Sequence, residues 1–147
     1  MTSIGVLIVD DFEPWRSFVS SALRQHLHLV SVREVSDGLD AVQKAQELQP
    51  DLILLDIGLP GLNGIKVARQ IQVVAPKAKI LFLSENYDHD VAEEALSTGA
   101  GGYVVKSDAG RELMTAIKAV MNGKRFVSER LRRTAPYLEL ERLQAAD

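Results

Sequence analysis

Apolar residues in this chain follow two patterns, short continuous runs and spacings of three or four residues. Four of five short β-type runs are almost continuously apolar, which is typical of parallel strands covered on both faces. The five runs predict strands at Ile4–Val9, Ser31–Val35, Leu52–Leu55, Lys79–Leu83 and Gly102–Val105.

The segments between and after these runs carry helical spacing, with several of them closed by proline or glycine. The expected helices surround Trp15–Leu23, Ala41–Leu48, Ile65–Ile71, Val91–Leu96 and Leu113–Val120. Strand and helix alternate along the chain, and right-handed crossovers place helices on both faces of the sheet. The predicted fold class is therefore α/β, a (βα)5 doubly wound sheet of five parallel strands.

The strand and helix pattern weakens beyond Gly123. A length of 147 residues suits one domain with a short appendage. We interpret residues 1–123 as that domain and residues 124–147 as a C-terminal tail or linker. The tail has some helical character around Leu138–Leu143, and Pro136 interrupts it.

The charge distribution argues against nucleic acid as a direct partner. Residues 1–123 sum to −5, residues 124–133 to +4 and residues 134–147 to −2. An acidic body with one short basic stretch is a poor match to DNA. We interpret Arg130, Arg132 and Arg133 in that stretch as a solvated segment, with a phosphate-binding arm as the less favoured alternative.

Two absences narrow the class of protein further. The chain has no cysteine, which excludes disulfides, thiol catalysis and cysteine-ligated metals. No apolar run approaches the ~20 residues that span a bilayer, and no signal peptide is visible. We therefore expect no membrane partner and a cytoplasmic location.

Polar residues stand where four of the runs end. In open parallel sheets, ligands bind beyond the carboxyl ends of the strands. These ends carry Asp10 with Asp11, then Asp56, Ser84 and Lys106. The fold would thus bring three carboxylates, a hydroxyl and an ammonium group to one edge of the sheet.

Clustered carboxylates need a counter-charge. Two unit charges 4 Å apart repel by about 4 kcal/mol at an effective dielectric constant near 20. An all-oxygen site with an open edge suits Mg²⁺, which also neutralises charge in phosphoryl transfer. A carboxylate can act as the nucleophile and form an aspartyl phosphate. Lys106 and Ser84 would then bind phosphoryl oxygens.

These residues and their order resemble a response-regulator receiver domain of two-component signalling, over roughly residues 3–123. The resemblance includes the acidic pair, the motif "DIGLPGLNG" at Asp56, the strand-end Ser84, and Tyr103 before Lys106. The stretch "STGAGGYVVKSDAGRELMTAIKAVMNGKRFVS" is similar to receivers of LuxR-type regulators. The resemblance implies a flavodoxin-like fold and a signalling switch rather than a metabolic enzyme.

The resemblance also implies roles for individual residues. Asp56 would receive a phosphoryl group from a sensor histidine kinase, a phosphotransfer protein or a small phosphodonor. Asp11 and Asp56 would bind Mg²⁺ directly, Asp10 largely through water, and the Gly58 carbonyl would complete the protein ligands. Lys106 would pair with a phosphoryl oxygen. Only this self-phosphorylation and a slow dephosphorylation would be catalysed.

Ser84 and Tyr103 would form the switch. The phosphoryl group would draw the Ser84 hydroxyl inward and open space into which the Tyr103 ring turns. This would re-form the face made by the fourth helix, fifth strand and fifth helix. That face, with Val91 and Ala92, suggests a homodimer on phosphorylation, although related receivers pair through the first and fifth helices. The output would be transcription through a DNA-binding domain absent from this chain, or a partner protein.

Two positions depart from the usual receiver pattern. Glu85 follows the switch hydroxyl, where many receivers have a small residue, and it would slow the approach of anionic phosphodonors or of hydrolytic water. Ser107 follows Lys106 where many receivers have proline, so no cis peptide bond is expected there.

Each residue also has a simpler explanation when taken alone. An Asp-Asp pair before a helix is often an N-cap, and Asp56 could be a turn residue. Tyr103 is otherwise a core residue, and packing alone would explain Trp15. The coincidence of polar groups at four strand ends favours a common site.

Two other functions remain as alternatives. A haloacid-dehalogenase-like phosphatase also uses an aspartyl phosphate, but its nucleophile lies on the first strand in an Asp-x-Asp pattern. A pseudo-receiver would serve only as an unphosphorylated interaction module.

Overall fold

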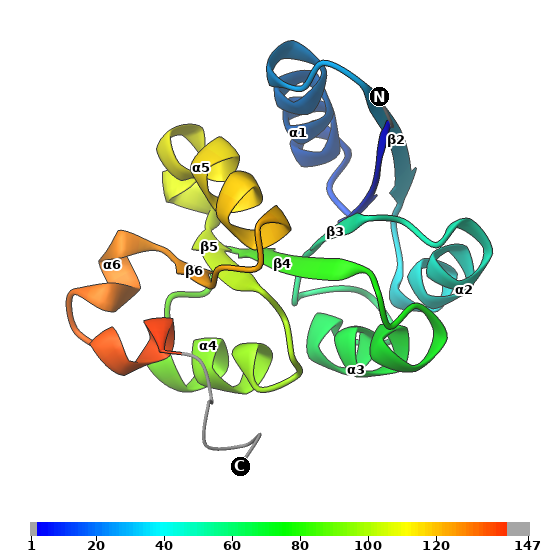
Figure 1. Ribbon diagram of the computed structural model, residues 1–147. Coiled ribbons are helices and arrows are strands. Elements are labelled where there is room, and N and C mark those ends of the chain that lie inside the picture. Colours follow the sequence, from blue (N-terminus) through cyan, green and yellow to red (C-terminus); the bar gives the residue numbers. More distant parts are fainter. Residues whose placement is uncertain (1–2, 141–147) are drawn as a thin grey trace.

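The computed structural model describes residues 3–140, which form a parallel sheet between two layers of helices (Figure 1). The strands are β1 (Ile4–Val9), β2 (Val30–Val35), β3 (Leu52–Leu55), β4 (Lys79–Ser84), β5 (Gly102–Val105) and β6 (Phe126–Val127). The helices are α1 (Glu13–His26), α2 (Gly38–Leu48), α3 (Gly64–Val74), α4 (His89–Leu96), α5 (Ala109–Met121) and α6 (Glu129–Arg132). Two 3₁₀ turns, η1 (Lys106–Asp108) and η2 (Pro136–Glu139), complete the elements.

The strand order is β2-β1-β3-β4-β5-β6, and neighbouring strands are parallel. Helices α1 and α5 cover one face, whereas α2, α3 and α4 cover the other (Figure 1). The chain order of the strands reverses at β1 and β3, which is where open parallel sheets bind ligands. The predicted α/β doubly wound fold is confirmed.

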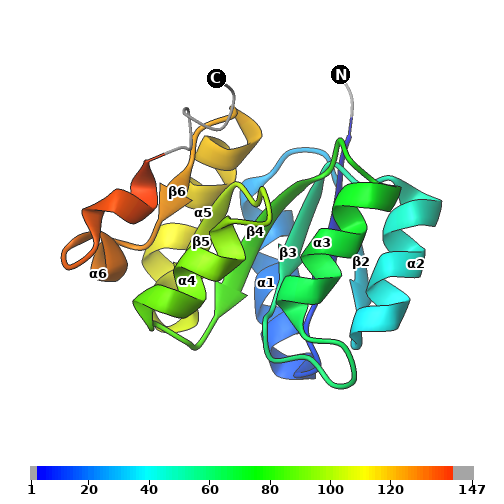
Figure 2. The same ribbon diagram turned by 90° about the horizontal axis from the view of Figure 1, so that it is seen from below.

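The predicted number of five strands is wrong, because β6 adds a sixth. Phe126 and Val127 pair in parallel with Gly102 and Tyr103 of β5. A run of two residues is too short to produce a strand pattern in the sequence. Figure 2 shows β6 beside β5, with α6 beyond it.

Residues 126–140, here called the C-terminal segment, pack against the domain although they lie in the predicted tail. Leu131, Ala135 and Leu138 of this segment are buried in the same apolar cluster as the sheet. The expected helical character at Leu138–Leu143 falls partly on residues 141–147, which lie outside the described residues. Within the described part, Pro136–Glu139 forms a 3₁₀ turn.

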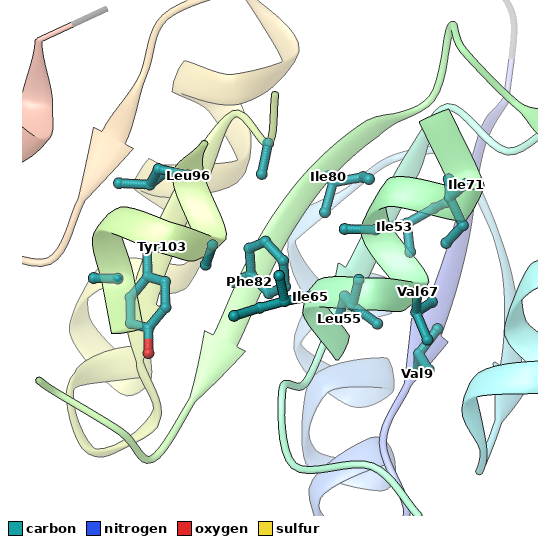
Figure 3. Close-up of a cluster of buried hydrophobic side chains, with 14 of the residues drawn as sticks. Val9, Ile53, Leu55, Ile65, Val67, Ile71, Ile80, Phe82, Leu96 and Tyr103 are labelled. Carbon is teal, nitrogen blue, oxygen red and sulfur yellow. The ribbon is translucent and has the colours of Figure 1, made fainter. Parts of the chain in front are cut away.

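The sheet separates two apolar clusters. Side chains of a strand alternate between its faces, so Ile53 and Leu55 face α3 whereas Leu52 and Leu54 belong to the cluster with α1 and α5. Figure 3 shows the first cluster, in which Phe82 and Tyr103 lie between the sheet and its helices. Burial on both faces explains why β3 is apolar at every position.

None of the helices between residues 3 and 140 has the length and hydropathy of a membrane-spanning helix.

Candidate functional site

The polar residues predicted at the strand ends line one cleft of about 510 Å³ at the carboxyl edge of the sheet. Its lining consists of Asp10, Asp11, Phe12, Asp56, Ile57, Gly58, Ser84, Glu85, Asn86 and Lys106. Every residue expected in the metal and phosphoryl site is therefore at the same cleft, while Tyr103 lies in the core beneath it.

Three carboxylates form an acidic cluster in this cleft. Asp10, Asp11 and Asp56 each offer one oxygen, and these oxygens lie within 4.8 Å of one another. Asp10 and Asp56 are buried, whereas Asp11 is exposed. Ligand oxygens of one Mg²⁺ lie no more than about 4.2 Å apart, given metal–oxygen distances near 2.1 Å. The cluster fits such an ion with at most a small rotation of a side chain.

Local hydrogen bonds orient Asp10 at the end of β1. Its Oδ1 accepts a hydrogen bond from the Phe12 amide at 2.8 Å, and its main-chain oxygen accepts one from Arg16 Nη1 at 2.7 Å. The N-cap of α1 is Phe12, which makes no side-chain cap bond. The alternative of an Asp N-cap is thus wrong for this helix.

Lys106 supplies the positive charge in the cleft. It begins η1 directly after β5, and its Nζ lies 2.6 Å from Asp10 Oδ2 and 3.7 Å from Asp56 Oδ2. The ammonium group also lies 5.1 Å from the centroid of the Trp15 ring, within the range of a cation–π contact. Trp15 therefore contacts Lys106 in the site, in addition to packing against the apolar cluster of α1 and α5.

Burial raises the pKa of Asp56 above its ordinary value of 3.8. The positive charge of Lys106 opposes this shift, and the nearby Asp10 adds to it. Hydrogen bonds from the main chain of Gly58 and Ile57 also favour the ionised form, the latter reaching Asp56 Oδ1 at 2.9 Å. A cation added to the cleft would therefore stabilise the ionised form of Asp56.

The loop after Asp56 closes tightly on the start of α3. Asn63 caps this helix, because its Oδ1 accepts hydrogen bonds from the amides of Ile65 and Lys66 at 3.0 Å each. The Gly64 amide donates to the Ile57 oxygen at 2.8 Å. A Cβ at Gly64 would overlap the main-chain oxygen of Asp56. This close approach explains the Asn-Gly at the end of the "DIGLPGLNG" motif.

Ser84 and Tyr103 meet at Asn86, a residue that the sequence analysis did not identify. The Asn86 amide donates to Ser84 Oγ at 3.0 Å, and the Asn86 carbonyl accepts from the Tyr103 hydroxyl at 2.7 Å. Both bonds use main-chain groups of Asn86, so its residue type carries no signal in the sequence. Asn86 links the two predicted switch residues.

Tyr103 is fully buried, and its ring centroid lies 6.2 Å from that of Phe82. Its hydroxyl points toward the loop after β4 (Figure 3). Burial is the main cause that raises the pKa of Tyr103 to about 12, so the phenol stays protonated and donates its hydrogen bond at neutral pH.

The two departures from the receiver pattern fit the observed geometry. Glu85 is exposed and lines the cleft. No cis peptide bond occurs between residues 3 and 140, in agreement with Ser107 in place of proline.

The family model described as "Response regulator receiver domain" matches residues 6–118. The chain belongs to the response regulator receiver family. It is 31% identical over 128 residues to the transcriptional activator protein ExaE of Pseudomonas putida, covering 87% of this chain and 60% of that protein. It is 31% identical over 125 residues to the response regulator UvrY of Escherichia coli, covering 85% of this chain and 57% of UvrY. The receiver thus spans little more than half the length of these curated relatives.

Solved structures agree with the family. A two-component response regulator of the LuxR family from Aurantimonas matches with a TM-score of 0.84 and 29% identity, over 95% of this chain and 100% of that one. The response regulator domain of Thermotoga maritima CheB matches with a TM-score of 0.75 and 30% identity, over 82% and 98% of the two chains. These comparisons confirm the predicted resemblance to receivers of LuxR-type regulators.

Proposed function

We propose that this receiver is a Mg²⁺-dependent phosphoacceptor switch in which Asp56 is phosphorylated. The observation that supports the proposal best is the convergence of Asp10, Asp11, Asp56 and Lys106 on one cleft. A structural role alone would not require three acids and a lysine at a common edge, because their mutual desolvation is costly.

The proposed reaction is an in-line displacement at phosphorus. An Asp56 oxygen forms a bond to phosphorus while the bond to the donor's leaving group breaks, and the leaving group takes the electron pair. A Mg²⁺ held by the three carboxylates and the Gly58 carbonyl would neutralise charge on the transferring group. Lys106 Nζ, 3.7 Å from Asp56 Oδ2, is near enough to bond a phosphoryl oxygen by leaving Asp10. The Ser84 hydroxyl would bond another.

The position of Tyr103 refines the proposed switch. The sequence hypothesis has this ring turn inward on phosphorylation, whereas here it is already buried, with Ser84 Oγ bonded to the Asn86 amide. We infer that Tyr103 already occupies its switched position here while Ser84 has still to turn toward the phosphoryl group, and that phosphorylation shifts the population toward inward Tyr103 rather than creating that position.

The partners follow from this role. A sensor histidine kinase or a phosphotransfer protein would supply the phosphoryl group. Output through a DNA-binding domain is proposed by analogy with RcsB, whose dimers bind DNA and whose structure matches with a TM-score of 0.82 and 25% identity. The cytoplasmic location remains a prediction.

The position of the C-terminal segment favours a different dimer face from the one expected from the sequence. The C-terminal segment lies against α4, β5 and α5 in this structure. A homodimer formed on phosphorylation would therefore use a face that this segment leaves open, and the surface of α1 and α5 is the remaining candidate from the sequence analysis.

The test is intact-mass measurement of the protein with Mg²⁺ and a small phosphodonor. We expect one added phosphoryl group, none in Asp56→Asn, and little without Mg²⁺ or in Asp11→Asn, which keeps the acceptor. Asp90→Asn alters an exposed acid on α4 and serves as the control with normal labelling. Labelling that persists in Asp56→Asn would overturn the assignment.

The same measurement separates the alternatives. Membership in the receiver family argues against a haloacid-dehalogenase-like phosphatase, and steady turnover of phosphate monoesters would be needed to revive it. Failure of the unchanged protein to bind Mg²⁺ or to accept a phosphoryl group would favour a pseudo-receiver.

A further inference from the structure

The C-terminal segment closes the side of the sheet next to Tyr103. Without β6, β5 would be the edge strand of the described sheet. Val127, Leu131, Ala135 and Leu138 belong to the same buried cluster as Tyr103. In Figure 1, α6 and the red turn after it lie beyond β6, beside α4. The segment therefore covers one side of the apolar cluster in which Tyr103 is buried.

A buried polar network fastens the start of this segment to β5 and α5. Ser128 is fully buried, and its Oγ donates to Glu112 Oε1 at 2.6 Å and accepts from the Val105 amide at 2.8 Å. Glu112 Oε2 accepts from the Glu129 amide at 3.1 Å. A network in which each buried group has a partner favours one docked position, because displacement would leave charged and polar groups unpaired.

Arg130 connects the segment to Asp108 and Tyr87, which lie close in sequence to the cleft residues Lys106 and Asn86. Its Nε and Nη2 bond the two oxygens of Asp108 at 3.0 and 3.1 Å, and Asp108 lies two residues after Lys106. The same guanidinium lies 5.7 Å from the centroid of the Tyr87 ring. A hydrogen bond of 2.6 Å between His89 Nε2 of α4 and Thr134 Oγ1 also joins the segment to the domain.

The loop that Arg130 contacts is also hydrogen-bonded to both switch residues. Tyr87 is adjacent to Asn86, whose amide and carbonyl bond Ser84 and Tyr103. Movement of the Ser84 hydroxyl toward a phosphoryl oxygen would release the Asn86 amide and shift this loop. Because Tyr87 follows Asn86 directly, such a shift would alter the contact between Arg130 and the Tyr87 ring.

We propose that the C-terminal segment is a built-in lock that holds Tyr103 inward, with Arg130 as a positioning residue, and that docking of the segment and phosphoryl binding at Asp56 stabilise each other. The inference rests on the proposed function, in which inward Tyr103 belongs to the phosphorylated state. Coupling between two sites is reciprocal. If docking of the segment strengthens phosphoryl binding, phosphorylation strengthens docking, and the segment then carries the signal out of the receiver.

The experiment uses the full chain with Mg²⁺ and beryllofluoride as the phosphoryl mimic. Fluorine NMR measures how tightly beryllofluoride binds, and hydrogen exchange measures protection of the amides in residues 126–140. We expect beryllofluoride to slow exchange in the segment. We expect Arg130→Ala to weaken beryllofluoride binding by about 3- to 10-fold, at the low end of known couplings because the contact is partly exposed.

Matched variants separate coupling from general destabilisation. Arg133→Ala removes the same charge three residues later, from a side chain that is 73% exposed and pairs with Glu129, and should leave beryllofluoride affinity unchanged. Arg130→Lys keeps the charge but loses the two-pronged bond to Asp108, so it should restore affinity only in part. Ser128→Ala should act in the same direction as Arg130→Ala, through the other anchor.

The outcomes distinguish this inference from the proposed function. Beryllofluoride that binds while exchange in residues 126–140 stays the same or quickens overturns the lock and leaves the phosphoacceptor proposal intact. Equal affinities for Arg130→Ala and Arg133→Ala also overturn it. No bound beryllofluoride in the unchanged chain overturns the proposed function and the lock together.

Discussion

Lys106 lies 2.6 Å from an oxygen of Asp10 but 3.7 Å from the nearest oxygen of Asp56. The lysine therefore pairs more directly with Asp10 than with the proposed acceptor Asp56. A divalent cation in the cleft would take over this role, and the ammonium group would be freed to bond a phosphoryl oxygen. Lys106 and the metal would thus bind the same carboxylate, Asp10, in turn, and both would then bind the phosphoryl group.

This competition predicts that Lys106→Met binds Mg²⁺ more tightly than the unchanged protein, by roughly 3- to 10-fold, because a repelling charge is removed from the cleft. The same variant should accept phosphoryl groups more slowly. Trp15 is the only tryptophan and lies beside Lys106, so its fluorescence reports the Mg²⁺ titration. Lys118→Met, on the exposed side of α5, is the matched control. Unchanged or weaker Mg²⁺ binding in Lys106→Met would contradict the competition.

The raised pKa of Asp56 predicts a pH-dependent stability in metal-free buffer. Above pH 3.8 the unfolded chain loses this proton before the folded chain does, so the folded state binds more protons in the window just above that value. The free energy of unfolding contributed by Asp56 therefore falls as pH rises through the window. Asp56→Asn removes this penalty and should have a higher Tm at pH 7, with the difference shrinking as the pH falls through this window toward 3.8.

Thermal unfolding with a chelator present, measured across this pH range, tests the relation. Added Mg²⁺ should raise the Tm of the unchanged protein and have little effect on Asp56→Asn, since one of the three carboxylates is lost. A variant that is less stable than the unchanged protein at pH 7 would contradict the assigned cause of the pKa shift.

Glu85 predicts slow reaction with anionic phosphodonors. It is exposed at the mouth of the cleft and carries a negative charge. Glu85→Gln, which preserves size, should speed phosphorylation severalfold at low salt, and the gain should shrink near 1 M salt, where the Debye length is about 3 Å. Glu85→Ala separates charge from bulk, because any further gain reports steric obstruction. Equal rates for the unchanged protein, Glu85→Gln and Glu85→Ala would contradict a role for Glu85 in slowing the phosphodonor.

Two glycines predict opposite effects of the same substitution. A Cβ at Gly64 would overlap main-chain atoms of Asp56 and lie 2.7 Å from Ile57 Cα, whereas nothing lies within 4 Å of a Cβ at Gly110 in α5. We expect Gly64→Ala to cost about 1–3 kcal/mol of stability and to disturb the Asp56 loop. Gly110→Ala should add up to about 1 kcal/mol, as alanine favours helices. Chemical unfolding measures the free energy of unfolding of both variants, and a change of the same sign in the two would contradict the prediction.

Much of this structure follows from the pattern of the sequence. The apolar runs located β1, β3 and β5 at their observed bounds, because side chains on both faces of a parallel strand must be apolar. The polar residues after these runs located the cleft, since parallel strands end at the same edge. These predictions rest on general rules of packing and did not depend on any single contact.

The rest depended on information that residue types do not carry. Asn86 acts through its main chain, and β6 is only two residues long. The C-terminal segment did leave a signal, since Val127, Leu131, Ala135 and Leu138 recur every three or four residues. The basic residues around them favoured a solvated tail instead. Arg130 is bound to Asp108, a partner that only the folded chain brings near.

The shortness of β6 has a consequence for where this protein can be cut. A two-residue outer strand presents few free main-chain groups, so this edge of the sheet offers little template for a strand of another molecule. A shortened chain ending at residue 123 would instead expose β5, whose four residues are all buried here. Such a fragment would be prone to aggregate edge to edge, and soluble expression would require the residues that follow.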